Sequence, residues 1–424
     1  GLERAHVLRD VPDALGIKNL VDQKKIKSAA IIGAGFIGVE LAENLQHRGI
    51  ETTIVEFRDS ILPQFDQEMI EPLQAELIAN GIKLALKAET EEVLEDTLRL
   101  KDGRIIPADL VVAAIGVVAD HHLAVDAGLK IGEAGGIWVD DQMRTSNKDI
   151  YAVGDAAEKV SALTGQHQMI WLANLANRHG RLVADVVAGE KVVARKSIGT
   201  GIIGAYGMAA ALTGLTEGLA QRMGIAHKVI HLHPSNHAGY YPGAERLSLK
   251  VLFDPESGKI LGAQGIGRDG VDKRIDVIAT AIYAGLTVDD LMNLELAYAP
   301  AFGSAKDAIN QTGYVGNNVI EGKTPTIQWH ELEAAQAAGA FLVDVRAKDE
   351  NQAGRIPGAT LIPADEIREH LAELEGKDVI VHCAVGQRGH TATQILRSHG
   401  IKVRNLDGGY TTWKMAMDAK ARVR

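Results

Sequence analysis

The sequence of 424 residues contains a single cysteine, Cys383, and this excludes an intrachain disulfide, a paired-cysteine redox motif and a cysteine-rich metal site. Aromatic residues are scarce, at 4%. Positive charge is in deficit, with 45 Lys and Arg against 55 Asp and Glu, so the net charge of −10 argues against gripping nucleic acid by bulk charge. A long uncharged window, residues 197–216, is rich in glycine and threonine and favours strand and turn over a membrane span. We therefore expect no nucleic acid and no membrane as partners, and a cytoplasmic location.

What the chain does contain is typical of a globular α/β protein. Hydrophobic residues make up 46% and charged residues 24%, and there are 45 glycines, which suit close contacts between helices and sheets. At roughly 150 residues per domain, the length predicts about three domains.

A glycine-rich turn near the start carries the first functional signal. An apolar run at 28–33 predicts a strand, 36–48 has helical spacing, and 51–56 predicts a second strand. Between the first strand and the helix lies G-x-G-x-x-G, formed by Gly33, Gly35, Phe36, Ile37 and Gly38. In such a turn, the glycines bring backbone N–H groups and a helix N-terminus against a pyrophosphate, so this βαβ unit predicts dinucleotide binding.

An acid at the end of the second strand refines that prediction. Glu56 occupies the position where a carboxylate accepts both adenosine ribose hydroxyls, and this favours NADH over NADPH. Arg58, two residues on, could reverse the preference, so the choice stays open. Glu40 lies on the first turns of the helix and faces the nicotinamide or simply complements the helix dipole.

The lone cysteine carries the second signal. Cys383 directly follows an apolar strand at 379–382 and precedes a loop with Gly386, Arg388 and Gly389 that leads into a helix. Backbone N–H groups, the helix dipole and a guanidinium would all stabilise a thiolate. We expect a nucleophile that accepts sulfur, with a buried structural cysteine as the alternative.

At this point the sequence resembles a rhodanese domain, over residues 326–424. The resemblance is carried by four segments: 341–346, 354–359, 383–388 and 407–410. It implies that Cys383 carries a persulfide, with the loop up to Arg388 as its cradle. Arg355 stands where many relatives have histidine.

The rest of the chain resembles the pyridine nucleotide-disulfide oxidoreductases, and among them the coenzyme A-disulfide and persulfide reductases. The resemblance implies FAD, NAD(P)H and coenzyme A as cofactors or bound carrier, a homodimer, and two tyrosines, Tyr240 and Tyr298, that reach the partner's active site. It also implies a nicotinamide turn at Gly116 and a flavin site. The residues that match that flavin site are Gly154, Asp155, Leu172 and Ala173.

One departure from this family is large, because no second glycine turn and no cysteine occur before Cys383. We expect the chain to be the carboxyl-terminal portion of a longer enzyme; the alternative is a natural chain that has lost half of its flavin site. The expected organisation is an α/β chain of five parts: a linker from a missing flavin-binding segment at 1–24, a Rossmann-like NAD(P) domain at 25–140, the remnant of a flavin domain at 141–197, an α+β dimerisation domain at 198–322, and the rhodanese domain at 326–424.

Together these features predict a flavoprotein that reduces coenzyme A disulfide, coenzyme A persulfide or polysulfide with NAD(P)H, joined to a sulfurtransferase. The alternative is a sulfurtransferase with a non-catalytic nucleotide-binding scaffold. His231, His233 and His237 invite a metal hypothesis. With no evident fourth ligand, we expect no metal there.

Overall fold

The computed structural model describes residues 5–23 and 26–423, and these form two compact units. One unit comprises the described residues of Gly1–Ile115, together with Ile202–Ala211 and Thr216–Arg424. The other comprises Gly116–Gly201 and Leu212–Leu215.

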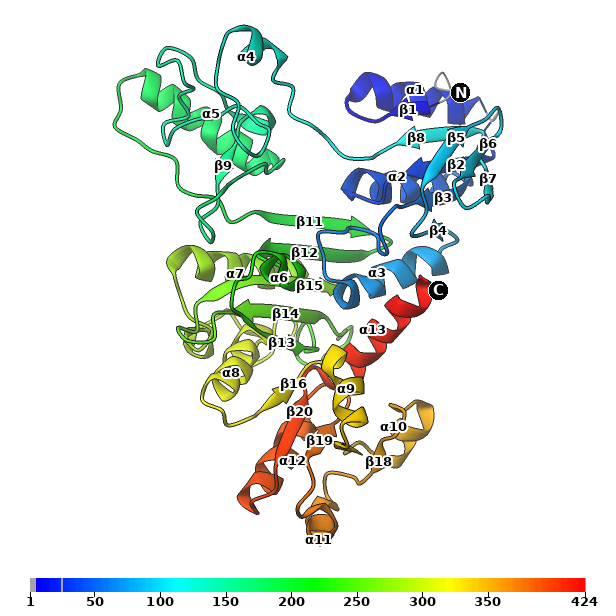
Figure 1. Ribbon diagram of the computed structural model, residues 1–424, viewed down its shortest axis with the longest axis vertical. Coiled ribbons are helices and arrows are strands. Elements are labelled where there is room, and N and C mark those ends of the chain that lie inside the picture. Colours follow the sequence, from blue (N-terminus) through cyan, green and yellow to red (C-terminus); the bar gives the residue numbers. More distant parts are fainter. Residues whose placement is uncertain (1–4, 24–25, 424) are drawn as a thin grey trace. The chain divides into compact units, whose positions relative to one another are not determined.

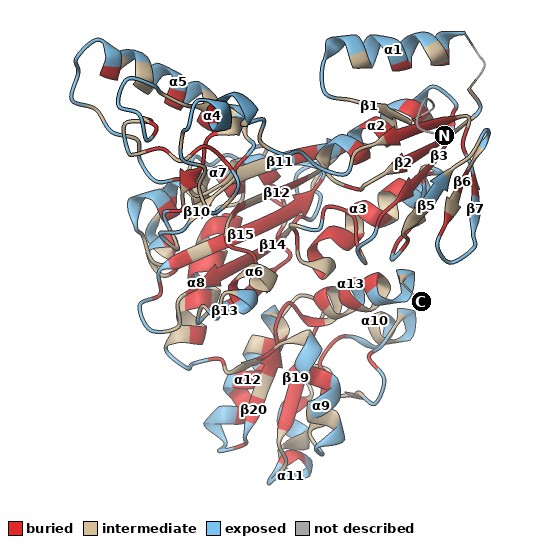
Figure 2. Cartoon of the chain, turned by 45° about the horizontal axis from the view of Figure 1, so that its top comes forward, coloured by how far each residue is buried: buried red, intermediate tan, exposed pale blue. Residues whose placement is uncertain are grey.

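The first sheet of the larger unit is parallel, with the strand order β1-β8-β2-β3-β4. Its central strands are short runs of Ala, Val and Ile, buried as expected for strands covered on both faces, and Figure 2 shows them in red. The strands are β1 (Ala5–Val7), β2 (Ser28–Ile32), β3 (Glu51–Val55), β4 (Lys83–Ala85) and β8 (Leu110–Ala113). The helices are α1 (Val11–Asp22), α2 (Phe36–His47) and α3 (Gln67–Ala79).

A small antiparallel sheet packs beside this one. It consists of β5 (Thr90–Val93), β6 (Thr97–Leu100) and β7 (Ile105–Pro107). Leu98 and Leu100 join Ala30, Val55 and Val111 of the parallel sheet in one buried cluster. The two sheets therefore share a core.

The stretch expected to be a linker, 1–24, contains regular structure where it is described. β1 adds to the edge of the parallel sheet through β8, and Asp10 caps α1 in a reciprocal arrangement with Asp13. Residues 1–4 and 24 of that stretch lie outside the described residues.

A second sheet, predicted as antiparallel from residues 200–265, has the order β11-β12-β15-β14-β13. Its register is antiparallel where β13 meets β14 and β14 meets β15. The strands are β11 (Thr200–Ala205), β12 (Met208–Gly214), β13 (Lys228–Leu232), β14 (Ser248–Phe253) and β15 (Ile260–Gly267). The helices of this region are α6 (Glu217–Arg222), α7 (Val271–Ala284) and α8 (Ala308–Ile320).

The last sheet is parallel, with the order β16-β20-β19-β17-β18. Its central strand β19 (Val379–His382) is buried throughout. The other strands are β16 (Thr326–Ile327), β17 (Phe341–Asp344), β18 (Thr360–Leu361) and β20 (Val403–Leu406). The helices are α9 (Leu332–Ala337), α10 (Lys348–Ala353), α11 (Leu371–Leu374), α12 (Gln387–Ser398) and α13 (Gly409–Arg422).

Helix α13 links this last region to the first sheet. It packs along α3, as Figure 1 shows in red and blue, and Arg422 Nε donates to Glu71 Oε1 at 2.7 Å. Helices from opposite ends of the chain therefore share one interface within the larger unit.

The smaller unit has little regular structure. It contains α4 (His122–Asp126), a 3₁₀ turn at Gly154–Ala156, β9 (Lys159–Val160), β10 (His167–Gln168) and α5 (Ala173–Val187). The sequence predicts a strand at 150–154, and this is wrong. Tyr151 makes only an isolated bridge to Arg144, because turns on both sides take up the neighbouring backbone groups.

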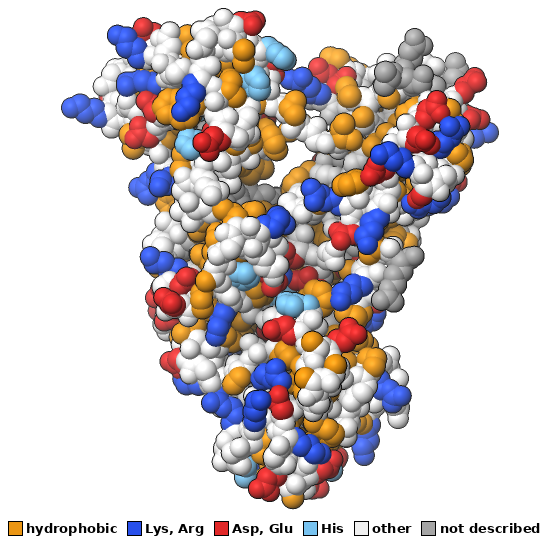
Figure 3. Space-filling model, viewed as in Figure 1, with side chains coloured by type: hydrophobic (Ala, Val, Ile, Leu, Met, Phe, Trp, Pro, Cys, Tyr) orange, Lys and Arg blue, Asp and Glu red, His pale blue; other side chains and the backbone are white. Residues whose placement is uncertain are grey.

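Two surface properties bear on function. In the described residues, every helix is too short or too polar to cross a membrane. Figure 3 shows acidic and basic side chains interspersed on the face that it presents.

Candidate functional site

The glycine turn between β2 and α2 has the close backbone approaches that its motif predicts. Gly33 has a φ of +104°, and a Cβ there would lie 2.3 Å from the carbonyl oxygen of Ala114. A Cβ at Gly38 would lie 2.1 Å from the oxygen of Gly33. Gly35 precedes α2 without any side-chain cap, so the first N–H groups of Phe36 and Ile37 face outward from the helix end. This cradle fits a dinucleotide pyrophosphate.

Glu56 lies at the end of β3, as predicted, and is buried. Its Oε2 accepts the N–H of Ala34 at 2.8 Å, and its Oε1 accepts the N–H of Arg58 at 2.8 Å. The carboxylate therefore braces the glycine turn, and each oxygen keeps a lone pair for a ribose hydroxyl.

Within the smaller unit, the predicted flavin residues lie close together. Gly154 has a φ of +71°, and a Cβ there would lie 3.7 Å from Ala176 in the first turns of α5. Asp155 is exposed beside it. Leu172 precedes α5 without a side-chain cap, and Ala173 begins the helix. An exposed acid beside an uncapped helix end fits the polar chain and phosphate of a flavin nucleotide. Gly116, at the start of this unit, has a φ of +106°.

The structure also brings Tyr240 and Tyr298 together, although 58 residues separate them in the sequence. The hydrogen bond between their hydroxyls raises the pKa of Tyr298. Both rings are exposed, at 78% and 50%. In the segments that carry them, the carbonyl oxygen of Asn236 and the carboxylate of Asp307 both accept from the buried Arg274, at 2.6 and 2.7 Å. The two exposed phenols thus stand on an anchored pair of loops.

Cys383 lies at the carboxyl end of β19, where the central strand of a parallel sheet opens into a loop. Gly386 has a φ of +94° and precedes α12 without a side-chain cap. The loop therefore turns before the helix starts, and Cys383 is buried, with 1% of its surface exposed.

Arg388 reaches this cysteine from the first turn of α12. Its guanidinium donates to both oxygens of Glu350 at 2.6 and 2.7 Å, and it interacts with Cys383 more weakly than with Glu350. The bond to Glu350 raises the pKa of Arg388, and the same bond lowers the pKa of Glu350. A fixed cation beside the sulfur stabilises a thiolate or an oxyanion.

The back of the cysteine loop rests on the segment after β20. The N–H groups of Tyr410 and Thr411 donate to the carbonyls of Cys383 and Ala384 at 2.8 and 2.9 Å. Gly409 has a φ of +62°, and a Cβ there would lie 2.5 Å from the carbonyl oxygen of Cys383. Only glycine permits this approach.

A buried charge cluster lies behind that segment, between α3, the antiparallel sheet and β20. Lys250 is fully buried and contacts Asp66 at 2.9 Å, Glu217 at 2.6 Å and Glu68. Burial alone would lower the pKa of Lys250. The three carboxylates outweigh burial, so that this pKa lies above its ordinary value. Among the described residues, the same three acids are the only group close enough to share a metal ion, and the ammonium already occupies the space between them.

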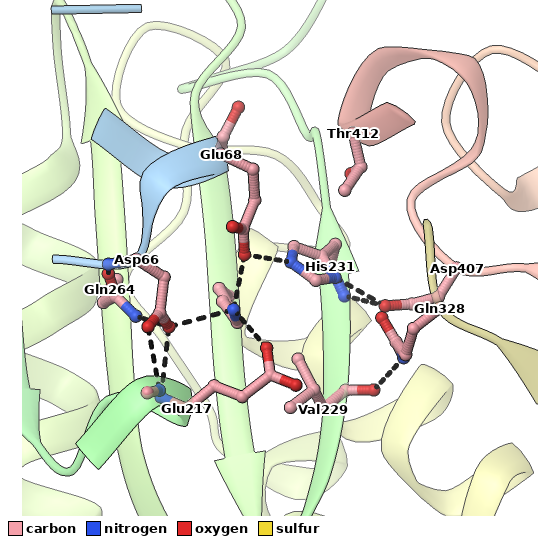
Figure 4. Close-up of polar contacts among 12 residues, drawn as sticks. Asp66, Glu68, Glu217, Val229, His231, Gln264, Gln328, Asp407 and Thr412 are labelled. Atoms are coloured by element: carbon pink, nitrogen blue, oxygen red, sulfur yellow. Dashed lines mark hydrogen bonds and ion pairs between the residues drawn. The ribbon is translucent and has the colours of Figure 1, made fainter. Parts of the chain in front are cut away.

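The three histidines considered as metal ligands have separate partners. His231 lies between Asp407 and Glu68, as Figure 4 shows. His233 Nδ1 lies 2.8 Å from Ser248 Oγ, and its Nε2 lies 2.8 Å from Thr412 Oγ1. His237 packs against the ring of Tyr241.

Sequence reasoning missed Glu350, Lys250 and the contacts of His231. Glu350 is 38 residues from Arg388, and His231 is 176 residues from Asp407. The rhodanese resemblance includes segment 407–410. The acid of that segment, Asp407, is the feature of the sequence that could have indicated its buried pair with His231.

Family models match three parts of the chain. Residues 1–180 match the pyridine nucleotide-disulphide oxidoreductase model, residues 206–308 match the dimerisation domain of that family, and residues 328–416 match the rhodanese-like domain. The predicted fold class and family resemblance are confirmed.

Individual relatives agree. A coenzyme A disulfide reductase of Staphylococcus haemolyticus is 30% identical over 308 residues, which cover 72% of this chain and 70% of the relative. The crystal structure of the reduced Bacillus anthracis CoADR-RHD has a TM-score of 0.96 and 42% identity, over 98% of this chain and 75% of that one. An NAD-dependent persulfide reductase from A. fulgidus has a TM-score of 0.89 and 35% identity, over 97% of this chain and 76% of that one.

Proposed function

Because the chain belongs to the pyridine nucleotide-disulphide oxidoreductase family and carries a rhodanese-like domain, we propose that it reduces coenzyme A disulfide, coenzyme A persulfide or polysulfide with NAD(P)H and couples this to sulfur transfer. One observation carries it: a dinucleotide-type glycine turn and a cysteine loop with a fixed arginine occur in one compact unit.

The nucleotide is held at the turn after β2. Gly33, Gly35 and Gly38 let the backbone and the N-terminus of α2, from Phe36 and Ile37, approach the pyrophosphate. Glu56 accepts the ribose hydroxyls with the lone pairs that Ala34 and Arg58 leave free. A carboxylate there repels a 2′-phosphate, and this favours NADH. The family resemblance assigns Gly116 to the nicotinamide turn.

The flavin is held through Gly154, Asp155, Leu172 and Ala173. When bound there, FAD would supply the redox chemistry that links NAD(P)H to a sulfur–sulfur bond. Within this chain, Asp155 would hold the polar chain of the flavin, and the uncapped start of α5 would orient it. No cysteine other than Cys383 is present, so no thiol step on the disulfide is assigned to these residues.

Sulfur transfer uses Cys383. Its thiolate attacks the sulfane sulfur of a donor such as thiosulfate, a Cys–S–S bond forms, and sulfite leaves with the electron pair of the broken bond. An acceptor thiolate, such as that of coenzyme A, then attacks the outer sulfur, and the cysteine thiolate leaves. Arg388 balances the negative charge in both steps.

The assembly is a homodimer built on the dimerisation domain at 198–322, in which Tyr240 and Tyr298 reach the partner's active site. The other parts are the NAD(P) domain at 25–140, the flavin remnant at 141–197 and the rhodanese domain at 326–424. A reactive thiol such as that of Cys383 stays reduced in a reducing compartment, and we therefore propose a cytoplasmic location.

Three measurements on the purified full chain test this function. We expect flavin absorbance, NADH oxidation that depends on added coenzyme A disulfide, and thiosulfate-to-cyanide sulfur transfer that Cys383→Ala abolishes. A colourless chain that ignores NADH but transfers sulfur would instead support the second candidate, a sulfurtransferase with a non-catalytic nucleotide-binding scaffold. That candidate is favoured by the single cysteine.

A further inference from the structure

Two histidines at the end of β13, His231 inside the strand and His233 just after its last residue, contact the segment that follows β20. The N–H of His231 donates to Asp407 Oδ2 at 2.9 Å, and its Nδ1 lies 2.6 Å from the same oxygen (Figure 4). Two residues further along the chain, just beyond the strand, His233 Nε2 lies 2.8 Å from Thr412 Oγ1. A strand of the antiparallel sheet therefore holds a turn that belongs to the rhodanese-like region.

The turn held in this way is the support of the cysteine loop. Asp407 precedes Gly408 and Gly409, which have φ values of +64° and +62°. A Cβ at Gly408 would lie 1.9 Å from Thr412 Oγ1 and 2.8 Å from His231 Cβ, and one at Gly409 would meet the carbonyl of Cys383. Gly408 packs closely against Thr412 and His231, and Gly409 packs closely against the carbonyl of Cys383. A displacement of Asp407 would therefore also displace the backbone of Cys383.

The positive charge of protonated His231 strengthens its contacts with two carboxylates, those of Asp407 and Glu68. The imidazole faces Asp407 after β20 and Glu68 on α3, with its Nε2 3.3 Å from Glu68 Oε1. Its other charged and titratable neighbours are Lys250 on β14 and His233, just after β13. Burial lowers the pKa of His231, but the hydrogen bonds to the two acids outweigh it and raise that pKa to about 9. Burial lowers the pKa of His233 to about 3, so His233 stays neutral.

We propose that His231 is a positioning residue for sulfur transfer: by holding Asp407 against Glu68, it fixes the turn on which the carbonyls of Cys383 and Ala384 rest. This inference rests on the proposed sulfurtransferase activity of Cys383. The strand that carries His231 thus takes part in the chemistry of another domain, without touching the reacting sulfur.

A pH dependence follows from the geometry. Below about pH 9 the imidazolium donates to both acids. Above it, the ring keeps one proton, one of the two bonds is lost, and Asp407 and Glu68 no longer share a cation. Sulfur transfer should therefore fall on an alkaline limb near pH 9.

The experiment measures thiosulfate-to-cyanide transfer and iodoacetamide alkylation of the full chain from pH 6 to about pH 10.5, over the range in which His231 titrates. Because Cys383 is the only cysteine, the alkylation in excess of that of Cys383→Ser reports on its thiol. The variants are His231→Gln and Asp407→Asn. The matched control is His227→Gln, whose imidazole bonds only the nearby carbonyl of Ile225 among the partners described. Cys383→Ser defines the background.

We expect His231→Gln to lower kcat about tenfold, to change KM by less than about twofold, and to lose the alkaline limb, since a displaced loop weakens the transition state more than donor binding. His227→Gln should match the wild type. Wild-type kcat and an intact alkaline limb in His231→Gln would overturn the inference while leaving the function of Cys383 in place. Transfer that survives in Cys383→Ser would overturn the proposed function itself. If His231→Gln does not fold, a wild-type profile without an alkaline limb, or unchanged kcat in Asp407→Asn, overturns the inference.

Discussion

Glu350 and Arg388 form a bidentate ion pair, with nitrogen–oxygen distances of 2.6 and 2.7 Å. This pair orients the guanidinium that interacts with Cys383, the only cysteine of the chain. Planar pairing of this kind fixes direction as well as charge. Neither residue of the pair is fully buried, with side chains 41% and 33% exposed. We therefore expect the Glu350–Arg388 pair to contribute more to the rate of sulfur transfer than to the free energy of unfolding.

Replacing Glu350 with glutamine tests that division. We expect sulfur transfer to fall by about tenfold, because Arg388 loses its orientation, while the free energy of unfolding changes by less than about 1 kcal/mol. Transfer assays and urea titrations of the same samples measure both. Asp349→Asn, at the exposed neighbouring position, serves as the control. A large loss of stability with normal transfer would contradict the expectation.

Gly38→Ala tests the nucleotide cradle. The new Cβ would lie 2.1 Å from the carbonyl oxygen of Gly33, so the turn must shift. We expect NADH to bind more than about tenfold more weakly, with sulfur transfer at Cys383 unchanged. Calorimetric titration with NADH measures the affinity. Gly16→Ala, on exposed α1 with no atom near its Cβ, is the matched control; equal affinities in the two variants would argue against the cradle.

Lys250→Met tests the buried charge cluster. Three carboxylates would lose their shared cation, and we expect a loss of about 3–5 kcal/mol at pH 7. Burial raises the pKa of Glu68, but Lys250 and His231 outweigh it and hold that pKa below its ordinary value of 4.5. The stabilisation is therefore present above pH 4.5 and is lost as the pH falls, so the difference between variant and wild type should shrink in acid.

Urea unfolding at several pH values measures this difference. The surface change Lys228→Met, at the exposed first position of β13, should alter stability by no more than about 0.5 kcal/mol. A difference between Lys250→Met and wild type that stays constant down to pH 3 would mean that packing, and not charge, accounts for the loss.

Tyr298→Phe tests the paired phenols. The change removes the hydroxyl that bonds Tyr240 and leaves the ring in place. In the flavin-loaded dimer we expect kcat for disulfide reduction to fall by about tenfold, with NADH binding and sulfur transfer unaffected. Tyr241→Phe, the half-exposed neighbour that packs on His237, should behave like the wild type. Equal activities in the two variants would assign Tyr298 to surface packing.

Local sequence patterns predict the elements that form the site, but they do not predict the long-range contacts around it. The elements 28–32, 36–47 and 51–55 follow from apolar runs punctuated by glycine, and the cysteine loop follows from an apolar strand that ends in Cys383. In these places the short-range pattern and the tertiary fold agree.

Long-range pairing accounts for what was missed. β1 has only three residues and exists because β8, a hundred residues later, offers it an edge. The sequence pattern of residues 169–188 predicts a helix that starts at Met169, but α5 begins four residues later, at Ala173. The roles of Glu350 and His231 depend on partners that no sequence spacing brings together.

Helix α13 starts beneath the cysteine loop and ends on α3, where Arg422 binds Glu71. The covalent tether at 322–325 is therefore not the sole attachment of the rhodanese-like region. Trypsin cleavage after Lys323 should leave two fragments that still elute together in gel filtration, and heating should release them in one joint melting event.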